Sequence, residues 1–87
     1  GVGTRLGRFA SAYAIYRCGA YRLEASCLEG HTGSRRILEG LGPKLEGVRP
    51  GYRLKEDVRL TELNFGAEIS TMDLSEIEGM AKVAGIV

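Results

Sequence analysis

A strict alternation of apolar and polar residues, set between two helix-like segments, most constrains how this chain can fold. Single polar residues separate four apolar ones, in the order Tyr21, Arg22, Leu23, Glu24, Ala25, Ser26, Cys27. Successive side chains of a strand point to opposite faces of a sheet. The period of two therefore predicts a half-buried strand over residues 21–27.

The segments on either side of this strand have the period of a helix. In the first, which we expect to end near Cys18 with Gly19 as a left-handed cap, the apolar residues are Leu6, Phe9, Ala10 and Tyr13. In the second, Thr32 or Ser34 is expected to cap a two-turn helix that Gly42-Pro43 ends, and its apolar side consists of Ile37, Leu38 and Leu41. The order helix, strand, helix follows.

The remaining residues predict further strands and a last helix. Residues 44–48 form a short strand candidate that Arg49-Pro50-Gly51 breaks, and a longer strand lies within residues 52–65. The phase of that longer strand is mixed, so it needs either a bulge or two covered faces. Asp73 and Glu76 have the spacing of a capping box before a helix whose apolar stripe is Leu74, Ile77, Met80, Ala81, Val83, Ala84 and Val87. That stripe docks either on the parent sheet or on a second copy.

Composition excludes several classes of function. The 87 residues carry a net charge of +1, which does not favour nucleic acid, and the arginines lack the interleaved aromatics of a single-strand binder. No apolar run approaches the ~18 residues needed to span a membrane, and no signal-peptide pattern is present, so we expect a cytoplasmic protein. Cys18 and Cys27 fit neither a metal motif nor a disulfide framework, and we expect buried free thiols and no metal.

A pair of glycines stands where the first helix begins. In Gly1-Val2-Gly3-Thr4 the absence of Cβ atoms lets the backbone approach an anion closely. The first-turn N–H groups and the positive end of the helix dipole then point at that anion. The segment is a candidate phosphate site, although two glycines before a helix more often form only a turn.

A second motif lies at a suitable distance and resembles the GCN5-related N-acetyltransferases (GNAT). In that family an Asn opens a helix running Ser, any residue, Arg, Val, Leu, Glu, Lys, Leu, Gly, Phe. The matching residues here are His31, Thr32, Gly33, Ser34, Arg35, Arg36, Ile37, Leu38, Glu39, Gly40, Leu41 and Gly42. In the same register, Gly1-Val2-Gly3-Thr4 falls on the end of the family's pyrophosphate loop, Gln/Arg-x-x-Gly-x-Gly/Ala. The continuation Lys44-Leu45-Glu46-Gly47-Val48-Arg49 and Asp57 resemble the branch that acetylates ribosomal-protein N-termini.

The resemblance implies a fold and a set of contacts. It implies a partial GNAT fold of the α/β (α+β) class, with a mixed sheet of about three strands and two or three helices. It places the pyrophosphate of acetyl-CoA on the backbone of residues 1–4 (Gly1, Val2, Gly3, Thr4). His31 would meet the pantetheine arm where the family has Asn, and Ser34 would lie alongside that arm.

Some positions depart from the family pattern. Leu38 occupies the position where many relatives place a Tyr that protonates the departing thiolate, although the ribosomal-protein branch also has leucine there. Gly40 replaces a frequent Lys, and Pro43 replaces the usual Phe. The family builds its active site between two central strands that splay apart. The first of these strands, the substrate-binding helices and the usual acidic base have no counterpart in the 87 residues, so no catalytic residue is assigned.

Two hypotheses about function follow. In the first, residues 1–66 are the C-terminal half of an acyl-CoA N-acetyltransferase domain and residues 67–87 a helical tail. Acetyl passes from acetyl-CoA to an amine, either a peptide N-terminus or a small amine. In the second, the chain is a non-catalytic half-domain that homodimerises and binds coenzyme A weakly or not at all. Either way we expect a homo-oligomer.

Overall fold

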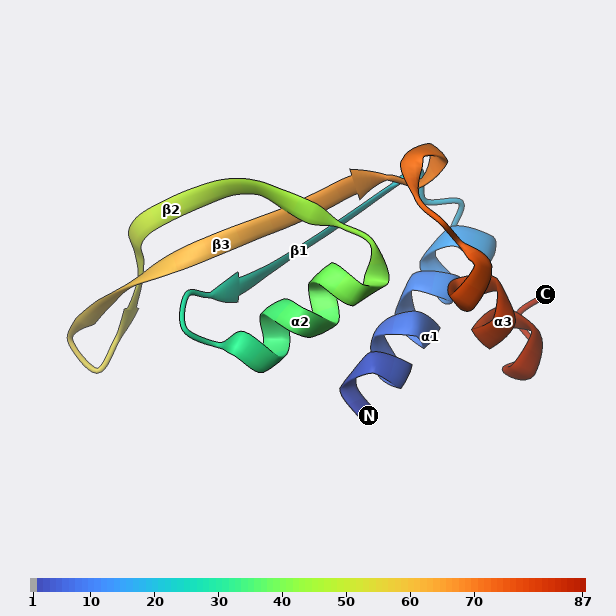
Figure 1. Cartoon of the computed structure of the whole chain (residues 1–87), viewed down its shortest axis with the longest axis horizontal. Helices are drawn as coiled ribbons and strands as arrows, with labels where there is room; N and C mark the ends of the chain where they lie inside the picture. Colours follow the sequence, from blue (N-terminus) through green and yellow to red (C-terminus); the bar gives the residue numbers. More distant parts are fainter. Residues whose placement is uncertain (1) are drawn as a thin grey trace.

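The computed structural model describes residues 2–87, in which helices and a three-stranded sheet lie side by side (Figure 1). The elements follow the order α1 (Val2–Tyr16), β1 (Arg22–Leu28), α2 (Thr32–Leu41), β2 (Lys44–Lys55), β3 (Val58–Glu68), a 3-10 turn (Ile69–Thr71) and α3 (Ser75–Val83). The predicted strand over residues 21–27 and its two flanking helices are confirmed. No helix within residues 2–87 is long and apolar enough to cross a lipid bilayer.

The strand order is β1-β3-β2, with both pairs antiparallel. The α+β class is therefore confirmed, but the sheet that residues 2–87 form is antiparallel rather than mixed. The sheet is antiparallel because the chain turns back directly after β2. As a result β3 runs antiparallel to β2 and lies between β2 and β1. β3 is thus the central strand, and β1 forms one edge of the sheet.

The β2–β3 hairpin differs from the predicted pattern. Arg49-Pro50-Gly51 does not end the strand: β2 continues to Lys55, with a shift of pairing register between Arg49 and Arg53. An edge strand tolerates the missing N–H of proline. The real break is a two-residue turn in which Glu56 and Asp57 have positive φ angles of 50° and 65°. Such turns match the twist of a hairpin but favour Asn-Gly, so their usual signal is absent here.

This turn provides a test of the hairpin. Non-glycine residues at positive φ are disfavoured, and Asn-Gly adopts this conformation readily. We expect the double substitution Glu56→Asn with Asp57→Gly to raise the free energy of unfolding by about 1 kcal/mol, measured by urea denaturation. Pro substituted at residue 57 should do the reverse, since its φ is fixed near −65°. An unchanged or lower stability of the Asn-Gly variant would contradict the turn geometry.

The two faces of the sheet differ in chemistry. Ala25, Leu45 and Phe65 pair in register on one face, with Cys27, Val48 and Leu63 in the next row. The α2 helix lies along this face of the sheet (Figure 1). The Arg35 guanidinium of that helix stands 6.0 Å from the centre of the Phe65 ring. The predicted irregularity within residues 52–65 is present: the pairing register shifts between Arg49, which pairs with Glu62, and Arg53, which pairs with Leu60. A further shift lies around Glu46 in β2. The other face carries polar side chains such as Glu24, Ser26 and Asn64, and no helix of residues 2–87 covers it.

The last helix packs on α1, which is neither of the two expected partners. Their shared core contains Ala12, Ile77, Ala81 and Ile86, each at most 9% exposed. Arg17, which directly follows α1, holds the C-terminal residues: its Nε donates to the carbonyl oxygen of Ile86 at 2.9 Å. The structure therefore unites α1 and α3 in a small helical layer beside the sheet.

The start of α3 is stabilised differently from the predicted capping box. Asp73 Oδ1 accepts hydrogen bonds from the Ser75 backbone N–H at 3.0 Å and from its hydroxyl at 2.8 Å, while Glu76 pairs with Arg8 of α1. The bonds from Ser75 lower the pKa of Asp73. The helix begins at Ser75, one residue later than a cap at Asp73 requires, so Glu76 lies too near its start to complete the box.

The apolar face of α1 that the sequence predicts is only partly buried. Leu6, Phe9 and Tyr13 are 63%, 45% and 51% exposed, whereas Ser11 and Ala12 are the buried residues of this helix. The α1 helix packs against α2 through one side and α3 through another, and the predicted stripe lies between them. A partner for that stripe is not supplied by residues 2–87.

Candidate functional site

Helices α1 and α2 pack closely because two glycines leave room for side chains of α2. A Cβ atom at Gly3 would lie 2.7 Å from Ile37 Cδ1, and one at Gly7 would lie 2.7 Å from Leu41 Cδ1. The step from Gly3 to Gly7 along α1 matches the step from Ile37 to Leu41 along α2. The two helices therefore run in the same direction. Gly3 therefore has a packing role, whatever else its amide does.

The parallel packing brings the N-terminal ends of both helices toward the same end of the layer. Gly3 is the second residue of α1 and faces Ile37, the sixth residue of α2. At 1.5 Å per residue, the two starts are staggered by about 6 Å, or roughly one turn. Two sets of first-turn N–H groups, with the positive ends of two dipoles, thus face one region of solvent.

The first turn of α1 contains most of the predicted pyrophosphate segment. Val2, Gly3 and Thr4 lie inside the helix rather than in a turn before it. Val2 is 75% exposed, Gly3 is also exposed and Thr4 is half-buried. Gly1 lies outside the described residues. The backbone of residues 2–4 is accessible to an anion from the solvent side.

His31 and Ser34 lie at the start of α2, and both are exposed. His31 occupies the N-cap position, but its side chain makes no capping hydrogen bond. The backbone N–H of His31 donates to the Leu28 carbonyl oxygen at 3.1 Å. The predicted caps Thr32 and Ser34 are wrong, because the helix already begins at Thr32. Both predicted side chains are thus available to a ligand, and the stagger between the helices separates them from residues 2–4.

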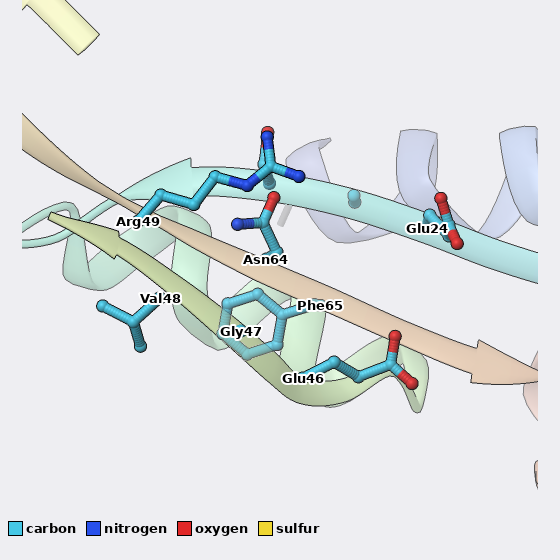
Figure 2. Close-up of a pocket in the computed structure, with 9 residues that line it drawn as sticks. Glu24, Glu46, Gly47, Val48, Arg49, Asn64 and Phe65 are labelled. Carbon is cyan, nitrogen blue, oxygen red and sulfur yellow. The ribbon is translucent and has the colours of Figure 1, made fainter. Parts of the chain in front are cut away.

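The helix-free face of the sheet holds a groove that the sequence did not reveal. Its volume is about 540 Å³, and its polar lining comes from all three strands: Glu24, Ser26, Glu46, Arg49 and Asn64 (Figure 2). The alternation of β1 hinted at this face, since Glu24 and Ser26 are its polar members. The contributions of β2 depend on the bulge at Glu46, for which the sequence gives no signal.

The guanidinium of Arg22 binds two carboxylates at one end of this groove. Arg22 Nε donates to Glu24 Oε1 at 3.0 Å, and Arg22 Nη2 donates to Glu46 Oε1. These bonds, the one to Glu46 most of all, raise the pKa of Arg22 above its ordinary value. Gly66 leaves the space for this cluster, because a Cβ atom there would collide with the Glu46 carboxylate.

Neither cysteine forms part of a metal site. Cys27 is only half-buried in β1, where a buried thiol was expected, and Cys18 is exposed after the end of α1. The expected burial of Cys18 is wrong because α1 ends at Tyr16, which places Cys18 in the connection to β1. Within residues 2–87 no group of three or more His, Cys, Asp or Glu side chains is arranged to hold a metal ion.

Comparison with known proteins relates the fold to one group of enzymes. No family model matches the sequence, and no curated protein matches it significantly. The structure is similar to a crystal structure described as that of "a putative phosphinothricin N-acetyltransferase", with a TM-score of 0.72 and 26% sequence identity. The similarity covers 78% of this chain and 42% of the other, so the chain spans less than half of that neighbour. The helices and antiparallel sheet described above are therefore a partial GNAT-like fold.

Proposed function

We propose that this chain is the coenzyme-A-binding half of an N-acetyltransferase domain, which presents acetyl-CoA to an amine. The observation that carries the proposal is the parallel packing of α1 and α2 through Gly3 and Gly7, combined with the acetyltransferase-like fold. This packing turns two helix N-termini toward one region, where their amides suit the charge of a diphosphate.

In this proposal, residues at the start of α1 and at the start of α2 contact different parts of the cofactor. The amides of Val2, Gly3 and Thr4 hold the pyrophosphate, together with Gly1, which lies outside the described residues. His31 and Ser34 lie one turn farther along and contact the pantetheine arm. Imidazole donates a hydrogen bond to a carbonyl as an asparagine amide does.

The chain's own part in the reaction is positioning. Leu38 has no proton to give the departing thiolate, so the side chain at this position contributes no acid. Holding the thioester beside an amine is itself a large share of the catalysis of an acyl transfer. The acceptor class that accompanies the proposal is a peptide N-terminus, as in the ribosomal-protein branch, or a small amine.

A charge placed in the first turn of α1 tests the proposal. Thr4→Glu puts a carboxylate beside the proposed diphosphate, where it repels the ligand while favouring the helix dipole. We expect coenzyme A to bind at least tenfold more weakly, by isothermal titration calorimetry, with no loss of thermal stability. Ser34→Glu, on the exposed first turn of α2, should weaken binding in the same way.

The matched control adds the same charge at the other end of α2. Gly40→Glu meets open space, since a Cβ atom at Gly40 has no neighbour within 4 Å. Coenzyme A should bind this variant as it binds the unmodified chain. Equal affinities for Thr4→Glu, Ser34→Glu and Gly40→Glu would refute the proposed site.

A second candidate function rests on the surface that α1 leaves open. Its exposed apolar residues are Val2, Leu6, Phe9 and Tyr13. Separately, β1 forms an edge of the sheet that pairs with no further strand within residues 2–87. Such surfaces favour association, and a non-catalytic homodimer would cover them. Sedimentation equilibrium distinguishes the two: a dimer whose mass is unaffected by coenzyme A, and which binds none, favours this alternative.

A further inference from the structure

The groove on the helix-free face of the sheet has opposite formal charges at its two ends. At one end, the carboxylates of Glu24 and Glu46 share the single guanidinium of Arg22, which leaves one negative charge. At the other end lies Arg49. Figure 2 shows its guanidinium toward one end of the groove and the two carboxylates toward the other.

The positive end is not neutralised by its neighbours. The only carboxylate paired with Arg49 within residues 2–87 is Glu62, at 3.9 Å. Glu62 is bound more closely by Arg53, through Nη2 at 2.8 Å and Nε at 2.9 Å. Arg49 also lies over the Tyr52 ring, 4.8 Å from its centre, which holds the guanidinium in place. One positive charge therefore remains in excess.

The middle of the groove is uncharged and suited to hydrogen bonding. Ser26 of β1 and Asn64 of β3 are paired in register, and Gly47 of β2 pairs with Asn64 from the other side. The hydroxyl and amide supply donors and acceptors, and Gly47 contributes no side chain that would fill the space. The lining thus presents an anion, a polar floor and a cation in sequence.

We propose that this groove binds a small zwitterion, a short peptide or amino acid with free termini. Its ammonium group lies toward Glu24 and Glu46, and its carboxylate pairs with Arg49. Arginine binds carboxylates with two parallel hydrogen bonds, which favours this orientation. Binding itself needs no coenzyme A.

The use of the bound amine as an acetyl acceptor rests on the proposed function above. In that transfer the nitrogen forms a bond to the acetyl carbonyl carbon and the thioester C–S bond breaks. The ammonium loses two protons: one goes to the sulfur of the departing thiolate and restores the thiol of coenzyme A, and the other goes to solvent water. Binding of the zwitterion and binding of coenzyme A are measured separately, so one can fail without the other.

The probe is the dipeptide Ala-Ala, compared with its N-acetylated and C-amidated forms. Each is titrated into the ¹⁵N-labelled chain at low ionic strength while amide chemical shifts are recorded. We expect Ala-Ala to shift the amides of Ser26, Gly47 and Asn64. Each blocked form should bind at least fivefold more weakly, since each lacks one charge. Because exposed charges are screened, 0.3 M salt should weaken the binding of Ala-Ala.

Substitutions assign the two ends. Arg49→Met should remove the preference for Ala-Ala over its amide, and Arg49→Lys should restore part of it. Glu46→Gln should reduce the preference for Ala-Ala over its N-acetyl form. Arg36→Met and Glu39→Gln, on exposed positions of α2, should change neither preference. Equal binding of the three forms, absence of shifts at 10 mM Ala-Ala, or preferences that survive Arg49→Met would overturn the proposal.

Discussion

Phe65→Ala is expected to remove a large share of the stability of this fold. Phe65 is 2% exposed in the central strand and is the largest fully buried side chain among the described residues. Removing such a ring costs about 3–5 kcal/mol, against the roughly 5–10 kcal/mol that stabilises a domain of this size. Urea denaturation followed by circular dichroism should show the loss.

Tyr52→Ala is the control for this substitution. Tyr52 is also an aromatic residue of the sheet, but it is 55% exposed in the edge strand β2. Its loss should cost less than about 1 kcal/mol, as is usual for surface substitutions. If the two variants had the same stability, the apolar face between the sheet and α2 would not be the core that we describe.

Ile77→Lys is expected to release α3 from α1. Ile77 is 2% exposed at the centre of the interface with Ala12 and Ala81, so a lysine there either buries an unpaired ammonium or separates the helices. We expect a loss of at least about 3 kcal/mol and rapid hydrogen exchange throughout residues 75–83. Mass spectrometry after pulsed exchange measures that change directly.

Val83→Lys provides the matched comparison on the same helix. Val83 is 86% exposed, although the sequence placed it on the same apolar stripe as Ile77. A lysine near the C-terminal end of a helix is favourable, so stability should change by no more than about 0.5 kcal/mol. Similar destabilisation by both substitutions would show that α3 packs in a different orientation.

The elements that the sequence predicted well are those set by local pattern. The strand around Ala25 is confirmed because one face of β1 packs toward helices and the other faces solvent. The turn at Glu56 and Asp57 was missed because these residues adopt positive φ without the glycine that marks such turns. Similarly, the continuation of β2 through Pro50 depends on its edge position, which is a property of the assembled sheet.

The site was less predictable than the fold because it depends on contacts between distant segments. The glycine motif identified residues 2–4, but the packing of Gly3 and Gly7 against α2 depends on tertiary structure. The groove between Glu24 and Arg49 joins three strands and a bulge, and no local pattern contains it. The sequence predicted that α1 is an amphipathic helix, but it does not indicate what covers the apolar stripe of that helix.

The most direct test of this account is a titration of the ¹⁵N-labelled chain with coenzyme A, followed by amide chemical shifts. The first-turn amides of α1 should move most, at Val2, Gly3 and Thr4, with smaller changes at His31 and Ser34. Adenosine diphosphate, which carries the same diphosphate, should compete for these amides, whereas adenosine should not. If the folded chain shows no shifts at these amides with millimolar coenzyme A, it is not the cofactor-binding half of an acetyltransferase.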